Sequence, residues 1–332
     1  MRKRHAQVEM IKAFKGLQIM NIAKFFRRFE KSIKSIIIIS KLWGVRKAIK
    51  VLIFNIILNA HPPPFKEEIV MTKMRTKMHI IPYDRGISRE LKIFKIHEPL
   101  TTKIIIDELK RKRILGAKVI VADIGSNIGY YAILEAKLLD RNSILICIEP
   151  IRRTFQYLLK NLKNNMVNMK YVKTFNVALS DRIGSARMIT CHGSNWARIL
   201  EKNHTESSFE VVAVTTGDQL FQSFDKIDLM RMDVEGHEYQ VIKGSFNVIK
   251  QHLPDLLIEI HPVMLGKHKL LELLCLLRNL GYKVKYFIPR YVDVPLAADD
   301  NDVMVVDINR LILCPPEWNF TLYLEHPLKS NK

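Results

Sequence analysis

A glycine-containing turn after a short apolar run constrains this chain more than any other feature. Residues 119–124 are apolar apart from Asp123. Gly125 follows, and a helical pattern over 128–139 begins around Gly129. A strand that leads through a glycine turn into a helix lets a ligand approach the backbone and the helix N-terminus closely. The segment therefore predicts a nucleotide-type site at the end of a buried strand.

A second apolar strand, predicted over 144–148, ends at Glu149. A carboxylate at the tip of a second parallel strand accepts hydrogen bonds from both hydroxyls of a ribose. The glycine spacing differs from the dinucleotide fingerprint, and the chain lacks the Gly-Lys-Ser/Thr ending of a phosphate-binding loop. Asp123 disfavours a pyrophosphate and suits a cationic or zwitterionic ligand. These features favour the aminoacid part and the nucleoside of S-adenosylmethionine.

Strands alternate with helices along most of the chain. This alternation predicts an α/β fold with a Rossmann-like, doubly wound, mostly parallel sheet, whose ligands bind at the carboxyl ends of the strands. With 332 residues, 48% hydrophobic, the chain is long enough for one large domain with additions. We predict strands over 119–123, 144–148, 171–176, 185–190, 211–214, 227–232, 255–260, 282–287, 303–306 and 310–313. We predict helices over 103–112, 128–139, 152–163, 216–223, 236–249 and 267–279.

Composition divides the chain into four parts. The prolines at 62–64 end a basic helical extension, and short apolar segments at 68–71, 77–81 and 91–94 predict a β-hairpin region that lies against the main sheet. Thr101 or Thr102 is the expected N-cap of the first helix of the main domain. The predicted parts are the extension 1–65, the hairpin region 66–100, the main domain 101–315 and a C-terminal tail 316–332.

The first sixty residues are strongly basic. They carry 14 Lys or Arg side chains and two acidic ones, a net charge of +12 out of +20 for the chain. Basic and apolar side chains around Trp43 predict an amphipathic helix, which would dock on the body, form a dimer or lie on a membrane surface. The apolar run 51–60 is too short to span a bilayer, and we find no convincing signal peptide.

The cysteines are scattered, without a Cys-x-x-Cys pair. This pattern predicts reduced thiols in a cytoplasmic protein and no zinc site. Contact with a membrane through residues 1–60 would then be peripheral. The four cysteines are Cys147, Cys191, Cys275 and Cys314.

Five segments carry motifs that occur together in one enzyme family. They read VADIGSNIGYY (121–131), IEP (148–150), NVALSD (176–181), DLMRMDVEGHE (228–238) and LIEIHP (257–262). Over about residues 80–290 the chain thereby resembles the FkbM family of S-adenosylmethionine-dependent methyltransferases. The resemblance implies a class I methyltransferase fold with a seven-stranded sheet, and it assigns no role to residues 1–65.

The resemblance also implies which residues contact the cofactor. Its methionine end would be lined by Asp123, Gly125 and Asn127, and Glu149 would hold the ribose. The loop at 176–178 would border the adenine. The residues expected to bind S-adenosylmethionine are Asp123, Gly125, Asn127, Gly129, Glu149, Ala178 and Asp181. His237 departs from the small or apolar residue that often stands there, which leaves open whether it faces the substrate.

Methyl transfer to a hydroxyl is an in-line displacement that requires alignment and removal of the hydroxyl proton by a base or a metal. The candidates are Asp233, Glu235, Glu259 and His261, because they follow two adjacent predicted strands. We expect Asp233 and His261 near the reacting centre, with Glu235 and Glu259 shaping the pocket. These carboxylates would suit a divalent ion, but the spacing does not require one, and we assign no metal ligands.

The absence of certain motifs indicates which kind of atom receives the methyl group. Amino-methylating enzymes commonly carry Asn/Asp-Pro-Pro-Tyr/Phe where residues 233–236 read Asp-Val-Glu-Gly. Oxygen methylation is therefore favoured, on a hydroxyl of a sugar, glycan, lipid or secondary metabolite. An RNA methyltransferase that grips phosphates with its basic extension is the alternative, with nucleic acid the less favoured partner. A peripheral membrane protein that only binds a nucleotide is a third reading.

Overall fold

The computed structural model describes residues 36–114, 118–189 and 209–329. The chain divides into two compact units, Met1–Asn55 and Ile56–Lys332. Within the described part of the extension, residues 36–43 and α2 (Val45–Ala60) are helical, as the sequence predicts. The two helices are separated at Gly44, whose φ of +85° suits glycine.

The second unit is built on a seven-stranded, mostly parallel sheet, which confirms the predicted fold class. The strand order is β11-β12-β10-β9-β3-β4-β5. Only the pairs that include β12 are antiparallel. The strands are β3 (Ile120–Ile124), β4 (Ile144–Ile148), β5 (Val172–Phe175), β9 (Leu229–Met232), β10 (Asp255–Ile260), β11 (Lys283–Pro289) and β12 (Phe320–Glu325).

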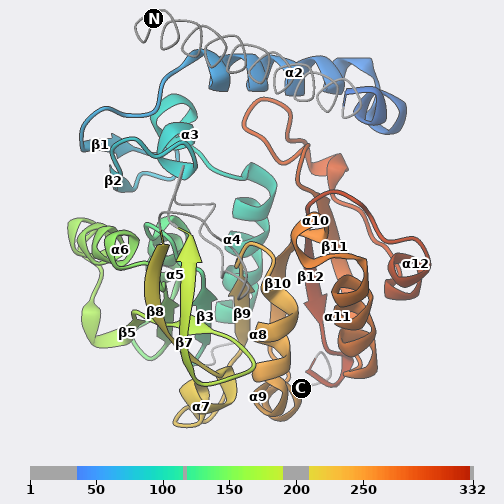
Figure 1. Ribbon diagram of the computed structural model, residues 1–332. Helices are drawn as coiled ribbons and strands as arrows, with labels where there is room; N and C mark the ends of the chain where they lie inside the picture. Colours follow the sequence, from blue (N-terminus) through green and yellow to red (C-terminus); the bar gives the residue numbers. More distant parts are fainter. Residues whose placement is uncertain (1–35, 115–117, 190–208, 330–332) are drawn as a thin grey trace, which may run out of the picture. The chain divides into compact units, whose positions relative to one another are not determined.

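Helices cover both faces of this sheet (Figure 1), and each face has its own apolar core. One core includes side chains of α7 (Gly217–Phe221), α8 (Glu238–Gly244), α9 (Phe246–His252), α11 (Lys267–Asn279) and α12 (Ile308–Leu313). The other includes side chains of α3 (Ile87–Phe94), α4 (Pro99–Ile114), α5 (Tyr130–Leu138) and α6 (Arg152–Asn164). Such coverage makes every residue of β3 buried, which explains its near-continuous apolar sequence.

Strand alternation decides which face each side chain occupies. In β3, Ala122 and Ile124 belong to the first core, whereas Val121 belongs to the second. Asp123 therefore points to the same face as Val121, toward α4 and α5. In β9, Arg231 shares this face with Leu229 by the same alternation.

A separate three-stranded sheet has the strand order β6-β8-β7. Its strands are β6 (Ala178–Leu179), β7 (Gly184–Ile189) and β8 (Phe209–Thr215). The structure thus confirms the predicted strands at 185–190 and 211–214 within the residues it describes. The whole segment 190–208 lies outside those residues.

The hairpin region is only partly as predicted. β1 (Glu68–Met71) and β2 (Lys77–Ile80) form the expected hairpin, but the third segment, 91–94, belongs to the helix α3. Its apolar residues Ile87 and Leu91 are four apart and both buried, which is helical spacing. The hairpin also bonds to α6, because the Asn161 side chain accepts from the His79 N–H and donates to the His79 carbonyl.

The expected caps of α4 are also corrected by the structure. The helix begins at Pro99, so Thr101 and Thr102 lie inside its first turn. The carboxylate of Asp293 accepts hydrogen bonds from the N–H groups of Leu100 (2.6 Å) and Thr101 (3.1 Å) and from the Thr101 hydroxyl (2.7 Å). A side chain almost two hundred residues away therefore satisfies the free donors at this helix start.

The C-terminal part differs most from the sequence prediction. Residues 310–313 belong to α12, and only Met304 of the segment 303–306 forms a β-bridge, to Phe287. The last strand, β12, lies in the segment predicted as a tail, and it is inserted between β10 and β11. Leu322 and Leu324 are fully buried there, so the sheet is incomplete without this segment.

Candidate functional site

A cleft opens at the carboxyl ends of β3, β4 and β9. Its lining combines backbone of the glycine turn, acidic side chains and an apolar wall from the segment around β6. The lining residues are Ile124, Gly125, Asn127, Ile148, Glu149, Pro150, Val177, Ala178, Leu179, Met188, Asp233, Val234, Glu235 and His237. Six of the residues expected from the sequence are among them: Gly125, Asn127, Glu149, Ala178, Asp233 and Glu235.

Gly125 makes the floor of the cleft out of backbone. Its φ is +80°, and a Cβ at this position would lie 2.0 Å from the carbonyl oxygen of Asp233. The N–H groups of Gly125 and Ser126 both donate to the Ile148 carbonyl, at 2.9 and 3.0 Å. The turn is thus fixed to β4 and packed against the loop after β9, which leaves no room for a side chain.

Glu149 is fixed at the wall of the cleft. Its carboxylate accepts hydrogen bonds from the N–H groups of Asn127 (3.0 Å) and Ile151 (2.9 Å). Burial nevertheless raises the pKa of Glu149 to about 8, because desolvation of the charge outweighs these two bonds. The glutamate is therefore oriented by backbone while it lacks a charged partner.

Asp123 lies beneath the cleft and is not among its lining residues. It is fully buried, and its Oδ1 is 2.8 Å from Nη1 of Arg231. The Arg231 guanidinium stacks on the Tyr131 ring at 3.9 Å and lies 3.6 Å from Asp233. Arg231 is not among the residues predicted from the sequence, although an arginine inside an otherwise apolar central strand signals a buried acidic partner.

Gly129 and Asp181 also lie outside the cleft lining. A Cβ at Gly129 would lie 2.8 Å from Leu158 Cδ1, so this glycine allows α5 to approach α6. Asp181 pairs with Lys243 at 3.0 Å. His237, whose orientation the sequence left open, does line the cleft, and its Nε2 is 2.9 Å from the Ser180 hydroxyl. Burial lowers the pKa of His237 to about 4, so its ring is neutral at physiological pH.

The four residues expected to act in catalysis meet at the ends of β9 and β10. His261 is almost fully buried, and its Nε2 lies 3.3 Å from Glu235 and 3.6 Å from Glu259. One atom of Asp233 lies within 4.8 Å of ligand atoms of Glu259 and His261. On the other side of the ring, Nδ1 is 2.7 Å from the buried carboxylate of Glu238, which the sequence analysis did not predict.

Burial and mutual repulsion both act on these carboxylates. Desolvation raises the pKa of Glu259 most, the negative charge of Asp233 also raises it, and the resulting pKa is about 8. The pKa of Glu235 is raised well above its usual range for the same reasons. The pKa of His261 is also raised, since its bond to Glu238 and the charges around it outweigh the burial of the ring. The cluster therefore carries more acidic groups than nearby cations can neutralise.

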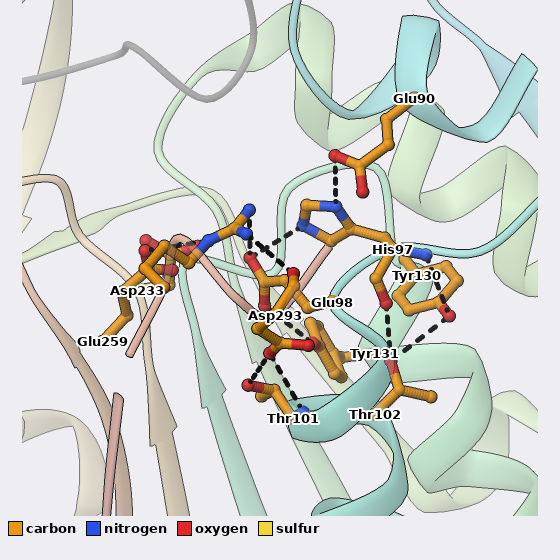
Figure 2. Close-up of polar contacts among 12 residues, drawn as sticks. Glu90, His97, Glu98, Thr101, Thr102, Tyr130, Tyr131, Asp233, Glu259 and Asp293 are labelled. Atoms are coloured by element: carbon orange, nitrogen blue, oxygen red, sulfur yellow. Dashed lines mark hydrogen bonds and ion pairs between the residues drawn. The ribbon is translucent and has the colours of Figure 1, made fainter. Parts of the chain in front are cut away.

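A second buried network joins this cluster to the start of α4 (Figure 2). His97 lies between Glu90 (3.1 Å) and Glu98 (3.0 Å). Arg290 then bridges Glu98 (3.0 Å) and Glu259 (3.3 Å). Burial lowers the pKa of His97, but the two carboxylates raise it more, to about 10. The network connects elements that are far apart in the sequence, and it pairs Glu259 with Arg290.

Residues 123–284 match the family model described as the methyltransferase FkbM domain. This segment is an FkbM methyltransferase domain. It contains every residue predicted from the sequence for the cofactor and the reacting centre, from Asp123 to His261. The FkbM domain does not include α4 or Arg290, which complete the buried network around it.

One curated relative is a hexuronic acid methyltransferase, AglP, from Haloferax volcanii. It is 28% identical over 148 residues, which make up 42% of this chain and 54% of AglP. The chain thus spans about half the length of this relative.

Two solved structures of methyltransferases are similar at low identity. The methyltransferase FkbM of Methylobacillus flagellatus is 17% identical with a TM-score of 0.41, covering 62% of this chain and 43% of that one. The precorrin-6y C5,15-methyltransferase of Geobacter metallireducens is 11% identical with a TM-score of 0.35, covering 68% of this chain and 86% of that one.

Among the described residues, none of the helices has both the length and the apolarity needed to cross a bilayer.

Proposed function

We propose that this chain is an S-adenosylmethionine-dependent methyltransferase that methylates a hydroxyl of a sugar or glycan. One observation carries the proposal: Asp233 and Glu235 belong both to the lining of the cleft and to the acidic cluster around His261. A ligand in the cleft therefore reaches a group of proton acceptors. An enzyme that methylates a hydroxyl needs this juxtaposition of a methyl donor and a base.

Three features of the cleft lining support binding of this cofactor. The backbone floor at Gly125 allows close approach, and the Glu149 carboxylate is oriented to accept hydrogen bonds from the two ribose hydroxyls. The apolar wall that includes Val177, Leu179 and Met188 suits a purine ring. When bound, the cofactor would supply a methyl group already activated on a sulfonium.

The chain's own residues would then orient the acceptor and take its proton. Asp233 and Glu235 are the members of the acidic cluster that line the cleft, and His261 lies directly behind Glu235. Glu238 fixes the His261 ring, and Glu259 is anchored by Arg290. In this arrangement Asp233 and Glu235 would lie nearest the acceptor, and His261 and Glu259 would support them from deeper in the protein.

The acceptor class rests on two observations. The loop after β9 reads Asp-Val-Glu-Gly at 233–236, without the proline and aromatic residues that orient an amine in many amino-methylating enzymes. The relative AglP is named as a hexuronic acid methyltransferase, which favours a sugar hydroxyl, including one on a sugar acid. The basic residues before position 60 would favour acidic acceptors by long-range attraction.

Calorimetry with S-adenosylmethionine tests the cofactor. We expect saturable binding by the full chain and clearly weaker binding by Glu149→Ala. The matched control is Glu210→Ala, which removes a glutamate outside the cleft lining. Mass spectrometry of hexuronate-containing glycans incubated with enzyme and cofactor should show a gain of one methyl group. Methylation of RNA instead, abolished by raised salt, would overturn the sugar acceptor. Unchanged cofactor affinity in Glu149→Ala would refute the site.

A further inference from the structure

Three side chains at the ends of β9 and β10 form a group suited to a metal ion. Asp233, Glu259 and His261 each offer one ligand atom, and these atoms lie within 4.8 Å of one another. We propose that they bind one divalent transition-metal ion at the edge of the cleft. Ligand atoms around such an ion lie up to about 4.2 Å apart. Asp233, the most exposed of the three side chains, would have to move slightly to bring the three ligand atoms to that distance.

His261 is oriented as a metal ligand. Its Nδ1 lies 2.7 Å from the carboxylate of Glu238, whose side chain is fully buried. With this carboxylate as the acceptor, Nδ1 carries a hydrogen, and Nε2 is directed toward Glu259 and Glu235, where a bound ion would displace its proton. A histidine that binds a metal through one nitrogen commonly donates the other N–H to a carboxylate, which fixes the ring and its tautomer.

Asp233 has an unsatisfied oxygen at the same place. Its Oδ1 is buried and makes no hydrogen bond within the described part of the chain. The other oxygen lies 3.6 Å from Arg231, a distance that gives attraction without a short hydrogen bond. A buried carboxylate oxygen without a partner is uncommon in folded proteins, and a metal ion would satisfy this one.

The charges around His261 also favour a cation. The carboxylates that surround or orient it are Asp233, Glu235, Glu238 and Glu259. Two arginines lie nearby, but Arg231 is bonded more closely to Asp123 (2.8 Å) and Arg290 more closely to Glu98 (3.0 Å). The described residues therefore place more acidic groups here than cations, and one divalent ion would offset their charge when they ionise.

The ligand types indicate which ion. One imidazole nitrogen with two carboxylate oxygens suits Mn²⁺, Fe²⁺, Co²⁺ or Zn²⁺ better than Mg²⁺ or Ca²⁺, which prefer oxygen ligands alone. Because Asp233 also lines the cleft, the ion would contact the oxygen of an acceptor and make its hydroxyl easier to deprotonate. This last step rests on the proposed function, whereas binding of the ion does not.

The test uses the full chain after chelator treatment, without cofactor or acceptor. Co²⁺ is titrated and followed by its visible absorption and by calorimetry. We expect one ion per chain with absorption bands typical of mixed nitrogen and oxygen ligands. Glu259→Gln and His261→Gln should abolish this binding, and Glu238→Gln should weaken it about 10- to 100-fold. His268→Ala, which removes an exposed histidine paired only with Glu272, should leave the site unchanged.

Each outcome decides the proposal. Saturable binding that requires Glu259 and His261 supports it, with circular dichroism and thermal melting to show that the variants fold. No saturable binding to the folded chain, or equal affinity in Glu238→Gln, His261→Gln and His268→Ala, overturns it. Since no methyl donor is present, failure here leaves the proposed methyl transfer standing. Loss of cofactor binding, in turn, leaves the metal site standing.

Discussion

Arg231 and Asp123 face each other on adjacent parallel strands and form a salt bridge of 2.8 Å beneath the cleft. Their side chains are 6% and 0% exposed, so neither charge is hydrated. Arg231 also stacks on Tyr131 and approaches Asp233. The pair therefore connects the interior of the sheet to the loop that carries the reacting centre.

Removing the arginine should destabilise the protein strongly. Arg231→Met leaves the Asp123 carboxylate buried without a counter-ion, which typically costs about 3–5 kcal/mol. Urea denaturation followed by circular dichroism measures the change. The control is Lys243→Met, which breaks an exposed pair with Asp181 and should alter the unfolding midpoint little. Equal effects of the two changes would contradict a structural role for the buried pair.

The glycine turn should not tolerate even one added methyl group. Gly125→Ala places a Cβ 2.0 Å from the Asp233 carbonyl oxygen in a backbone with φ of +80°. We expect a loss of stability well above the roughly 1–2 kcal/mol of left-handed strain alone, together with loss of S-adenosylmethionine binding. Gly44→Ala is the control, since its φ is +85° and nothing lies within 4 Å. Similar melting temperatures in both variants would show that the close contact is unimportant.

Cofactor affinity should depend on pH through Glu149. The pKa of this residue is raised to about 8 from its usual 4.5 by burial, so the free protein carries a protonated Glu149 at neutral pH. A ribose donates to the ionised form, so affinity should rise as pH increases toward 8 and then level off. Glu149→Gln should flatten this profile, as calorimetry between pH 6 and about 9 would reveal.

The same shift has a consequence for stability. Because the folded pKa lies above the unfolded value, the folded protein binds a proton that the unfolded chain releases between 4.5 and about 8. The stabilising contribution of Glu149 is therefore present below pH 4.5 and is lost as pH rises through 8. Relative to Glu149→Gln, the ligand-free protein should become less stable over this range in denaturant titrations.

Asp233 should matter for turnover and not for cofactor binding. Asp233→Asn keeps the size of the side chain but removes its charge, so we expect an unchanged calorimetric affinity for S-adenosylmethionine. Turnover on a methyl acceptor should fall about 100-fold or more, the range for loss of a proton-transfer group. Asp218→Asn, a helix-capping carboxylate outside the cleft, serves as the control. Full activity of Asp233→Asn would exclude it from the mechanism.

The sequence predicted the sheet well because its signals are local. The glycine turn, the acidic residues at strand ends and the apolar runs of β4 and β10 depend on a few neighbouring residues. Gly125 and Glu149 fall at the cleft for the same reason, since a parallel sheet brings the carboxyl ends of its strands together. Asp123 is different, because strand alternation turns it away from the cleft toward α5.

Long-range contacts account for what the sequence analysis missed. Asp293 caps α4, Arg290 joins Glu98 to Glu259, and Glu238 orients His261. Each of these partners is distant in the chain or lies on another element, so no local pattern marks the pair. The strand β12 was missed because its apolar segment follows a helix and two prolines, and its place between β10 and β11 is decided by the sheet alone.

The amino-acid sequence by itself determined most of the order of strands and helices between β3 and β11, the glycine turn and the set of acidic residues that end the strands. Only the tertiary structure decided which of these carboxylates face the cleft, which are neutralised by arginines and which surround His261. Periodicity and glycine preferences act over a few residues, whereas burial and pairing of charges depend on elements that meet only after folding.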